Sequence, residues 1–448
     1  MKAPICDFIN KYVSNDVQRL HMPGHKGKSF LGCEILDITE VLGADALYSA
    51  DGIIRESEEN ASSIFESGAT YYSCEGSSLS VRAMCYLARA YAIANRQGGR
   101  LWALAGRNAH SSFLSASVLL DFEIEWLSAE GESYLSGNIS PEAIEKALSS
   151  VDILPFCVYI TSPDYLGNIS DIKEISGVCK KYGVPLLVDN AHGAYLKFLE
   201  NSKHPLDLGA TMCCDSAHKT LPSLTGGGYL HISKDAPEFF GSNAKSALAL
   251  FGSSSPSYLI LASLDNLNLY LCDGYQEKLC SFLSEVRVLK KNLIALGYTL
   301  VGNEELKLTI RAKDYGYLGS ELYSILYEKG LVCEFSDKDY LVMMLTPESG
   351  KKALDAIFSA LSAIPKKTPI LDTPPRFFPC KAVMSPKSAY MSEGEEIDIK
   401  NATGRIMAGL SVSCPPAVCV VSCGEEINSD AIKMLEYYGI TKCKVVKR

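Results

Sequence analysis

The sequence lacks several features that would assign it to a broad class at once. It has no excess of positive charge, since 43 Lys and Arg residues face 52 Asp and Glu residues and give a formal net charge of −9. A nucleic-acid-binding protein presents a basic face, so this balance argues against that class. No uninterrupted apolar run reaches the length of about 18 residues that a membrane-spanning helix needs. The first residues, MKAPICDFINKYV, lack the apolar core of a secretory signal and predict a short helix.

The chain has 16 cysteines but lacks the spacing of a metal site. The densest group, Cys414, Cys419 and Cys423, contains neither a CxxC pair nor a nearby histidine. In a long acidic chain without a secretory signal, reduced thiols that pack as small apolar residues are expected. We therefore expect a cytoplasmic protein that binds no metal.

Short apolar runs alternate with amphipathic stretches between about residues 68 and 233. Strands are predicted at residues 101–106, 122–126, 156–161, 185–190 and 211–215. Between the third and the fourth, Ile172, Ile175 and Cys179 fall on one helical face, and Gly183 follows as a stop signal. This alternation indicates an α/β fold with a mostly parallel sheet covered on both faces. In such sheets the ligand site gathers at the carboxyl ends of the strands.

The pattern changes beyond about residue 271. A long amphipathic helix, the strand LKLTIRAK, another helix, the hairpin LVCEFSDKDYLVMML and a helix from about Ser349 predict a small α+β unit. The proline-rich segment PKKTPILDTPPRFFP indicates a linker, and residues 382–448 predict short strands and a terminal helix. We expect an N-terminal arm (residues 1–50), a large domain (51–275) and a smaller C-terminal α+β domain (276–448), with the linker at about residues 364–380.

Lys219 stands in an unusual place, directly after a strand of buried type and before a stretch too small and kinked to form a helix. Lysine is rare in such surroundings unless its amine is used. Asp189 ends the preceding strand and needs a cationic partner or hydrogen bonds, although capping of a following helix is an equally open reading. The 30 residues from Asp189 to Lys219 leave room for one crossover and one strand, which would bring both to the same edge of the sheet.

Other polar residues also follow strand ends. Gly76, Ser77 and Ser78 open a predicted helix, where they form either a phosphate cradle or an ordinary serine N-cap. The remaining candidates are His110, His192, Ser216 and His218. A buried acid for a pyridine nitrogen, a ring-stacking histidine, a helix N-terminus for a phosphate and a lysine for a Schiff base are the parts that pyridoxal phosphate requires. We infer that Lys219 carries this cofactor, and that the glycines at 226–228 let the backbone turn tightly beside it.

Six ordered segments resemble the landmarks of the ornithine/lysine/arginine decarboxylases. They are HMPGHKGK (residues 21–28), DITEVLGADALYSADGIIRESEE (37–59), RNAHSS (107–112), VDNAHGAY (188–195), SAHKTLPSLT (216–225) and SSPSYLILASLD (254–265). The resemblance covers nearly the whole chain and is to the short form of these fold-type-I pyridoxal-phosphate enzymes, which lacks an N-terminal wing domain. It implies that the large domain binds the cofactor, that the protein is a homodimer or higher homo-oligomer, and that it decarboxylates arginine, lysine or ornithine to a polyamine or diamine precursor.

The resemblance also implies a role for each candidate residue. Lys219 would form the Schiff base, Asp189 would pair with the pyridine nitrogen, and His110 would stack on the ring. His192 would border the cofactor. The phosphate would be held by Ser77, Ser78, Ser216, His218 and Ser254 of the partner subunit. Glu425 and Glu426 would bind the distal amine or guanidinium of the substrate, and an exposed acidic turn is an equally open reading of this pair.

The chain departs from the family pattern mainly in the substrate-facing parts. The signature Tyr-Pro-Pro-Gly reads Cys-Pro-Pro-Ala at residues 414–417, Pro-Gly-Glu reads Cys-Gly-Glu at 423–425, and His-Lys-Ser reads His-Ser-Ser at 110–112. Two alternatives therefore stay open. One is another fold-type-I reaction such as transamination, for which Arg311 or Arg405 would hold the substrate α-carboxylate. The other is a non-catalytic relative that acts as a binding subunit, against which the intact Lys219 and Asp189 argue.

The replacement Lys219→Ala is expected to abolish covalent binding of pyridoxal phosphate, because Lys219 is the amine predicted at this strand end. The wild-type protein should show a visible absorption band of bound cofactor that borohydride removes, leaving the label on the chain. Spectra before and after reduction, followed by peptide mapping, check both proteins. A reducible adduct that survives in Lys219→Ala would assign the Schiff base to another lysine.

Overall fold

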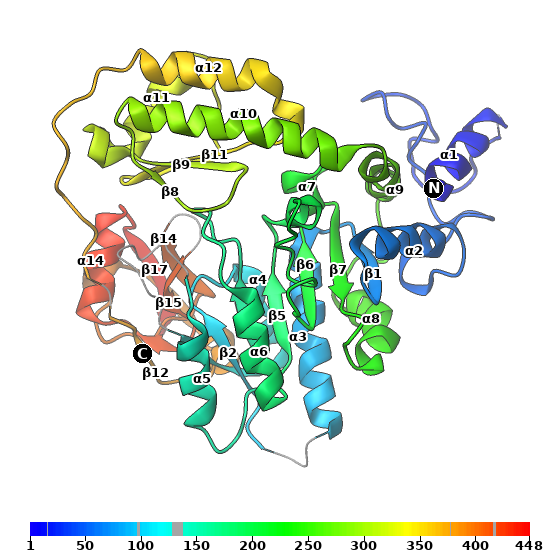
Figure 1. Ribbon diagram of the computed structural model, residues 1–448. Coiled ribbons are helices and arrows are strands. Elements are labelled where there is room, and N and C mark those ends of the chain that lie inside the picture. Colours follow the sequence, from blue (N-terminus) through cyan, green and yellow to red (C-terminus); the bar gives the residue numbers. More distant parts are fainter. Residues whose placement is uncertain (16, 96–98, 128–137, 377, 415–417) are drawn as a thin grey trace. The chain divides into compact units, whose positions relative to one another are not determined.

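The computed structural model describes residues 1–15, 17–95, 99–127, 138–376, 378–414 and 418–448 (Figure 1). The backbone groups into two compact units, one of residues 1–99 and 179–277 and the other of residues 100–178 and 278–448. This grouping does not decide where the predicted arm, domains and linker begin and end, so those boundaries stay predictions. Within the described residues, no helix combines the length and the apolar character that crossing a membrane requires.

Four strands of the first unit hydrogen-bond in the order β1-β7-β6-β5. They are β1 (Ala69–Ser73), β7 (Gly228–Ile232), β6 (Met212–Asp215) and β5 (Leu186–Asp189). β5 and β6 are parallel, whereas β7 is antiparallel to both β6 and β1. Two antiparallel steps restore the original direction, so β1, β5 and β6 run the same way. Their carboxyl ends therefore lie at one edge, where β7 begins.

Helices surround these strands. They are α1 (Pro4–Ser14), α2 (Ile53–Phe65), α3 (Gly76–Asn95), the single turn α7 (Ala217–Thr220), α8 (Glu238–Phe251) and α9 (Tyr258–Cys272), with 3-10 turns η1 (Leu47–Ser49) and η2 (Ala194–Phe198). α3 is rich in Ala, the residue that most favours helix. It packs across all four strands and against α8. Its first turn follows β1 directly, so the helix N-terminus lies at the edge where β5 and β6 end.

The second unit contains three parallel strands in the order β4-β2-β3, followed by an antiparallel sheet in the order β10-β11-β9-β8. The parallel strands are β2 (Trp102–Gly106), β3 (Glu123–Leu127) and β4 (Cys157–Thr161), with helices α4 (Ser111–Leu120) and α5 (Pro141–Ser149). The antiparallel strands are β8 (Leu300–Val301), β9 (Lys307–Arg311), β10 (Phe335–Ser336) and β11 (Tyr340–Met344), with α11 (Gly319–Glu328), α12 (Gly350–Ser362), η3 (Ala312–Tyr315) and η4 (Pro347–Ser349). The helices α6 (Ile172–Tyr182) and α10 (Tyr275–Ala295) each extend over the end of one unit's range and the start of the other's.

The last part of the second unit is built from paired short strands, β12 with β16, β13 with β17 and β14 with β15. Their bounds are β12 (Lys381–Ala382), β13 (Gly394–Asp398), β14 (Ser411–Cys414), β15 (Val418–Ser422), β16 (Glu425–Glu426) and β17 (Lys442–Val446), with α13 (Pro386–Met391), η5 (Ile399–Asn401) and α14 (Ser429–Tyr437). Val420, Leu435 and Val445 are fully buried among these elements. Apolar side chains from strands and helix thus form one small core that fixes residues 418–426.

The predicted elements are largely confirmed. All five predicted strands are present as β2 to β6, each within one residue at either end, and the helix predicted after the third of them is α6. The N-terminal helix, the long helix after residue 271, the hairpin and the helix near Ser349 are α1, α10, β10–β11 and α12. β1 and β7 were not predicted, and Lys219 itself lies in the short helix α7. β1 (ATYYS) and β7 (GYLHI) contain polar residues or glycine and so form no continuous apolar run that would mark them.

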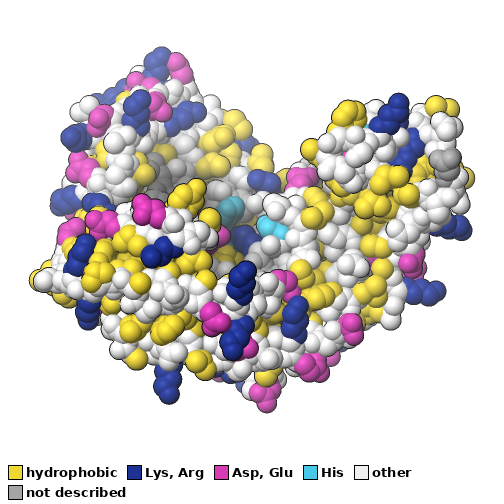
Figure 2. All heavy atoms as spheres, turned by 90° about the horizontal axis from the view of Figure 1, so that it is seen from above, with side chains coloured by type: hydrophobic (Ala, Val, Ile, Leu, Met, Phe, Trp, Pro, Cys, Tyr) yellow, Lys and Arg dark blue, Asp and Glu magenta, His cyan; other side chains and the backbone are white. Residues whose placement is uncertain are grey.

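The N-terminal stretch of the first unit leaves large apolar side chains in solvent. Leu20 is 94% exposed, Phe30 79% and Leu31 89%. Figure 2 shows hydrophobic side chains gathered at the right of the view, where the N-terminal part of the chain lies. Exposed apolar groups of this density are typical of a surface that another chain covers.

Candidate active site

Lys219 and His192, both predicted from the sequence, are in direct contact at the edge where β5 and β6 end. The amine Nζ of the half-buried Lys219 lies 3.2 Å from Nε2 of His192, whose side chain is almost buried. The backbone N–H of Lys219 donates to the carbonyl of Ser216, at 3.0 Å, which fixes the turn α7. The lysine is thus held at a strand end with its amine beside an imidazole.

Asp189 is the last residue of β5 and is 2% exposed. Its Oδ1 accepts the backbone N–H of Ala191 at 3.2 Å and faces the thiol of Cys214 at 3.6 Å. The next helical turn, η2, begins only at Ala194 and is preceded by Gly193, so Asp189 closes a turn and does not cap that helix. A buried carboxylate at this edge is suited to a cationic or protonated ligand group.

Ser77 and Ser216 form the centre of the predicted phosphate site. The hydroxyl of Ser216 donates to Oγ of Ser77 at 2.9 Å and accepts the backbone N–H of Ser77 at 3.4 Å. Ser77 lies in the first turn of α3, which also contains the half-buried Ser78, and Ser216 directly precedes α7. A helix of this length carries a partial positive charge at its N-terminus, so the arrangement favours an anion.

His218 and the glycines at 226–228 lie beside this anion site. Nδ1 of His218 lies 2.8 Å from the carbonyl of Gly227, so Nδ1 carries the proton and donates it. A Cβ on Gly226, whose φ is +97°, would lie 2.7 Å from the carbonyl of Cys74. A Cβ on Gly228 would lie 2.8 Å from the carbonyl of Asp215 and 3.0 Å from the carbonyl carbon of Gly76. Only glycine permits these backbones to approach so closely.

Ser254 is exposed in the segment between α8 and α9. The backbone N–H of its neighbour Ser253 donates to Oε1 of Glu75 at 2.7 Å. Glu75 immediately precedes the first turn of α3, so this segment is tied to the anion site of its own chain. The expected reach of Ser254 into a partner's site stays a prediction.

These residues of the first unit fit pyridoxal phosphate. A helix N-terminus with the hydroxyls of Ser77 and Ser216 matches the phosphate, and the amine of Lys219 matches the aldehyde. The buried acid Asp189 ends the strand parallel to the one that leads to Lys219, as a partner for the ring nitrogen. The structure thus collects six predicted residues at one edge, with Ser78 on the adjoining helical turn: Lys219, Asp189, His192, Ser77, Ser216 and His218.

His110 belongs to the second unit and caps α4. Its Nδ1 accepts the backbone N–H of Ser112 at 3.2 Å and pairs with the hydroxyl of Ser112 at 2.8 Å, while the residue is exposed. Both contacts are made by Nδ1 in the plane of the ring and do not test stacking on its face. Its predicted stacking role therefore stays a prediction.

Glu425 is held by an arginine that the sequence analysis did not select. Its two carboxylate oxygens accept Nη1 and Nη2 of Arg107 at 2.9 and 2.6 Å, and Oε2 also accepts the backbone N–H of Ser422 at 2.8 Å. Arg107 is 6% exposed and Glu425 2%. Nε and Nη2 of Arg107 also donate to the carbonyls of Cys419 and Val420, each at 2.9 Å. Both oxygens of Glu425 thus bind a guanidinium of the protein itself, and the expected contact of Glu425 with the substrate stays a prediction.

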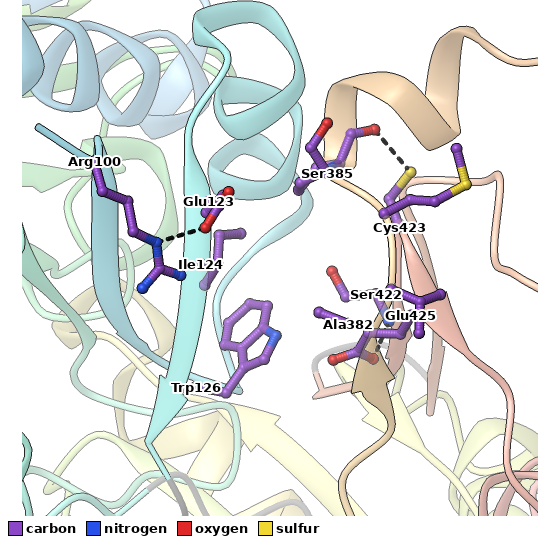
Figure 3. A pocket seen from close by; sticks show the side chains of 12 residues that line it. Arg100, Glu123, Ile124, Trp126, Ala382, Ser385, Ser422, Cys423 and Glu425 are labelled. Carbon is purple, nitrogen blue, oxygen red and sulfur yellow. Dashed lines mark hydrogen bonds and ion pairs between the residues drawn. The ribbon is translucent and has the colours of Figure 1, made fainter.

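A cavity of about 320 Å³ adjoins this pair in the second unit (Figure 3). It lies between β3 and the residues at 382–386 and 422–425, and Trp126, Ser385 and Cys423 are among the side chains around it. Arg100 at its rim pairs with Glu123 and Glu125 at 2.6 Å each. Among the predicted site residues that the structure describes, Glu425 is the one that lines this cavity. The carboxylate of Glu425 is paired with the guanidinium of Arg107.

Glu426 and the two arginines considered for an α-carboxylate have different surroundings. Glu426 is exposed and lies opposite Lys381 in the β12–β16 pair. Arg311 pairs with Asp314 at 2.7 Å, and Arg405 pairs with Glu395 at 2.5 Å. Both arginines thus already have an acidic partner. The altered signature residues 415–417 lie outside the described residues.

The partners of the buried charges were not predicted from the sequence. Arg107 stands in the quoted segment RNAHSS, and Asn190 directly follows Asp189. The side chains His204 and His231 contact Asp215, which ends β6. The sequence signal that could have indicated these partners is a charged residue at the end of an apolar strand. Such a residue is buried and requires hydrogen-bond or ion-pair partners from elsewhere in the chain.

Comparison with known proteins identifies a family for the chain. The family models "Orn/Lys/Arg decarboxylase, major domain" and "Orn/Lys/Arg decarboxylase, C-terminal domain" match residues 3–292 and 377–444. An arginine decarboxylase of Bacillus subtilis (strain 168) is 27% identical over 97% of this chain and 93% of its own length. The uncharacterized protein YaaO of the same organism is 29% identical over 97% of this chain and 94% of its own length. The lysine decarboxylase LdcF of Francisella novicida superposes with a TM-score of 0.81 at 16% identity, over 99% of this chain and 81% of its own, and so shares the fold.

The replacement Arg107→Met is expected to lower the free energy of unfolding by about 3–5 kcal/mol, because it leaves the buried carboxylate of Glu425 without its counter-ion. Arg100→Met is the matched control, since Arg100 is 42% exposed and its ion pairs are of the surface type. Such pairs contribute about 0–1 kcal/mol. Urea unfolding of both variants checks the difference. Equal midpoints would show that the Arg107 pair adds no more stability than the exposed one.

Proposed function

Since the chain belongs to the Orn/Lys/Arg decarboxylase family, we propose that it decarboxylates a basic amino acid, with arginine, lysine and ornithine in that loose order of preference. It is a pyridoxal-phosphate-dependent decarboxylase, a lyase of the α/β fold-type-I class with a smaller C-terminal α+β domain. Its product would be the corresponding amine, a precursor of polyamines or diamines. The relatives named arginine decarboxylase support arginine as the first substrate to test.

The observation that carries the proposal is the convergence of Lys219, Asp189 and the Ser77–Ser216 pair at one strand edge. We propose that Lys219 binds the cofactor, that Ser77, Ser78, Ser216 and His218 hold its phosphate, and that His110 stacks on its ring. When bound, the cofactor supplies an electron sink for the electron pair that departing carbon dioxide leaves on the substrate.

Each residue at the edge has a task that its surroundings support. The carboxylate of Asp189 raises the proton affinity of a pyridine nitrogen beside it, because an adjacent anion stabilises the protonated form. The imidazole of His192, 3.2 Å from the lysine amine, can accept a proton from that amine. The N–H groups at the start of α3 neutralise phosphate charge and fix the position of the ring.

For the substrate side chain we propose Glu426 as the first carboxylate to test. It is exposed, whereas both oxygens of Glu425 are bonded to Arg107. Glu425 would take part only if Arg107 released it, which would leave the buried guanidinium of Arg107 without its counter-ion. A guanidinium gains most from a bidentate carboxylate, and this supports arginine over the shorter amines.

We further propose that the protein works as a homodimer in the cytoplasm, with Ser254 directed to the phosphate site of the partner subunit. The exposure of Leu20, Phe30 and Leu31 supports this proposal, because they form an apolar surface that a second copy of the chain would cover.

The replacement Asp189→Asn is expected to leave the cofactor bound and to reduce turnover at least about a hundredfold, a loss of roughly 3 kcal/mol in transition-state stabilisation. The neutral amide no longer favours a protonated ring nitrogen. The visible absorption of the cofactor and the rate of carbon dioxide release check the two halves of this expectation. Unchanged turnover would reduce Asp189 to the acceptor of the Ala191 N–H that the turn requires.

Carbon dioxide release from arginine, lysine, ornithine and a neutral amino acid is expected to favour the basic substrates. Glu426→Gln should lower kcat/KM about tenfold or more on the preferred basic amino acid and leave the neutral one unchanged, because one charge-assisted pair is lost. Glu425→Gln serves as the control that perturbs a buried pair. Losses that are equal on basic and neutral substrates in both variants would mean that neither glutamate recognises charge, and preference for a neutral amino acid would end the proposal of a basic substrate.

A further inference from the structure

Asp215, the last residue of β6, carries a fully buried carboxylate with three side-chain partners. Oδ2 lies 3.1 Å from Nε2 of His204 and 3.2 Å from Nε2 of His231, and Oδ1 accepts Nδ2 of Asn190 at 2.6 Å. All four residues are 0% exposed. The partners come from three places in the chain: the residue after β5, the loop after η2, and β7. A buried carboxylate persists only when donors of this kind replace its water.

The protons of this cluster can be assigned from its contacts. Burial raises the pKa of Asp215, but His204 and His231 outweigh it, so the pKa lies below its ordinary value and the carboxylate is ionised. Burial lowers the pKa of His231 more than Asp215 raises it. Nε2 of His231 faces a carboxylate oxygen, which accepts, so Nε2 carries a proton and donates it to Asp215, while Nδ1 pairs with the hydroxyl of Thr70 at 2.8 Å. Thr70 in turn pairs with Ser67, also at 2.8 Å.

Asn190 joins the two parallel strands twice. Its backbone N–H donates to the carbonyl of Cys214 at 3.0 Å, and its side chain donates to Asp215. A Cβ on Gly193 would lie 2.0 Å from Oδ1 of Asn190, so the asparagine fills the turn that follows β5. The end of β5 is therefore fixed to the end of β6 by backbone and side chain together.

This double connection lies next to the proposed cofactor residues on both strands. Asp189 directly precedes Asn190, and Ser216 directly follows Asp215. The turn from Ser216 to Lys219 is closed by its own hydrogen bond, as described above. One rigid cofactor must reach the acid, the lysine and the phosphate site at once, so the separation of the two strand ends decides whether it fits.

We propose that Asn190 and Asp215 form the positioning contact that sets the separation of Asp189 and Lys219. The proposal rests on the assignment of those two residues to the cofactor. His204 and His231 keep Asp215 ionised and fixed, and the chain through Thr70 and Ser67 extends the same support to β1 and the turn before it. Asn190 and Asp215 touch neither substrate nor cofactor and act through their neighbours.

Two histidines and an aspartate are also the donor types of a zinc site, and the three ligand atoms lie within 4.8 Å of one another. In this cluster each ring nitrogen that faces Asp215 is at hydrogen-bond distance from it. Direct N–H donation therefore accounts for the arrangement, and the metal content of the protein distinguishes the two readings.

The test compares Asn190→Ala with Asn268→Ala in the full-length protein. Asn268 is a matched control because it is also 0% exposed, its Nδ2 donates to the carbonyl of Ser57 and to the hydroxyl of Tyr72, and its Oδ1, like that of Asn190, has no partner among the described residues. Asn190→Ala should weaken pyridoxal phosphate binding about tenfold or more, the effect of one hydrogen bond to a charged group. It should also alter the circular dichroism of the visible cofactor band and lower kcat with little change in KM. Asn268→Ala should reduce the stability of the apoprotein similarly and leave these cofactor properties unchanged.

Several outcomes would overturn the proposal. Equal cofactor affinity and equal circular dichroism in the two variants would make Asn190 an ordinary structural residue, and stoichiometric zinc in the purified wild-type protein would make Asp215 a metal ligand. If Asn190→Ala does not fold, Asn190→Ser, which is too short to reach Asp215, is measured in the same way. Wild-type protein that binds no cofactor through Lys219 would instead end the proposed assignment of the site.

Discussion

The shared direction of β1, β5 and β6 is the constraint on which the rest of the site depends. β7 lies between β1 and β6 and is antiparallel to both, so β1 and β6 run in the same direction. For this reason the N-terminus of α3, which follows β1, lies at the same edge as Asp189 and Lys219. Gly228, the first residue of β7, then brings its backbone against Asp215 and Gly76. A side chain at Gly228 would separate the helix from the strand, and the anion site would lose its contact with Ser216.

Each unit contains a buried carboxylate whose oxygens accept hydrogen bonds from N–H groups of other segments. Asp215 is surrounded by N–H donors from three segments, and Glu425 by the guanidinium of Arg107 and a backbone N–H. Asp215 joins segments that are 11 to 25 residues away along the chain, and Glu425 joins one that is 318 residues away. These clusters therefore act as specific joints, since an apolar contact would allow neighbouring arrangements of similar energy.

The sequence was sufficient for features that depend on local pattern. The apolar runs marked β2 to β6, and the position of Lys219 after β6 indicated the cofactor. It was insufficient where the outcome depends on partners far along the chain. Glu425 looked like a free substrate ligand because nothing in its own segment reveals Arg107. His231 lies in a strand without polar alternation, and its partner Asp215 is recognised only once β6 and β7 are paired.

The pairing of Arg107 with Glu425 has a consequence for how the protein is made. The two residues are 318 positions apart, so the guanidinium emerges from the ribosome long before its carboxylate. At a synthesis rate of about 5–20 residues per second, this interval lasts roughly 15 to 60 seconds. During that time the loop after β2 cannot reach its final packing, because the carbonyls of Cys419 and Val420 that also bind Arg107 have not yet been made. Completion of the second unit thus waits for the synthesis of residues 419–425.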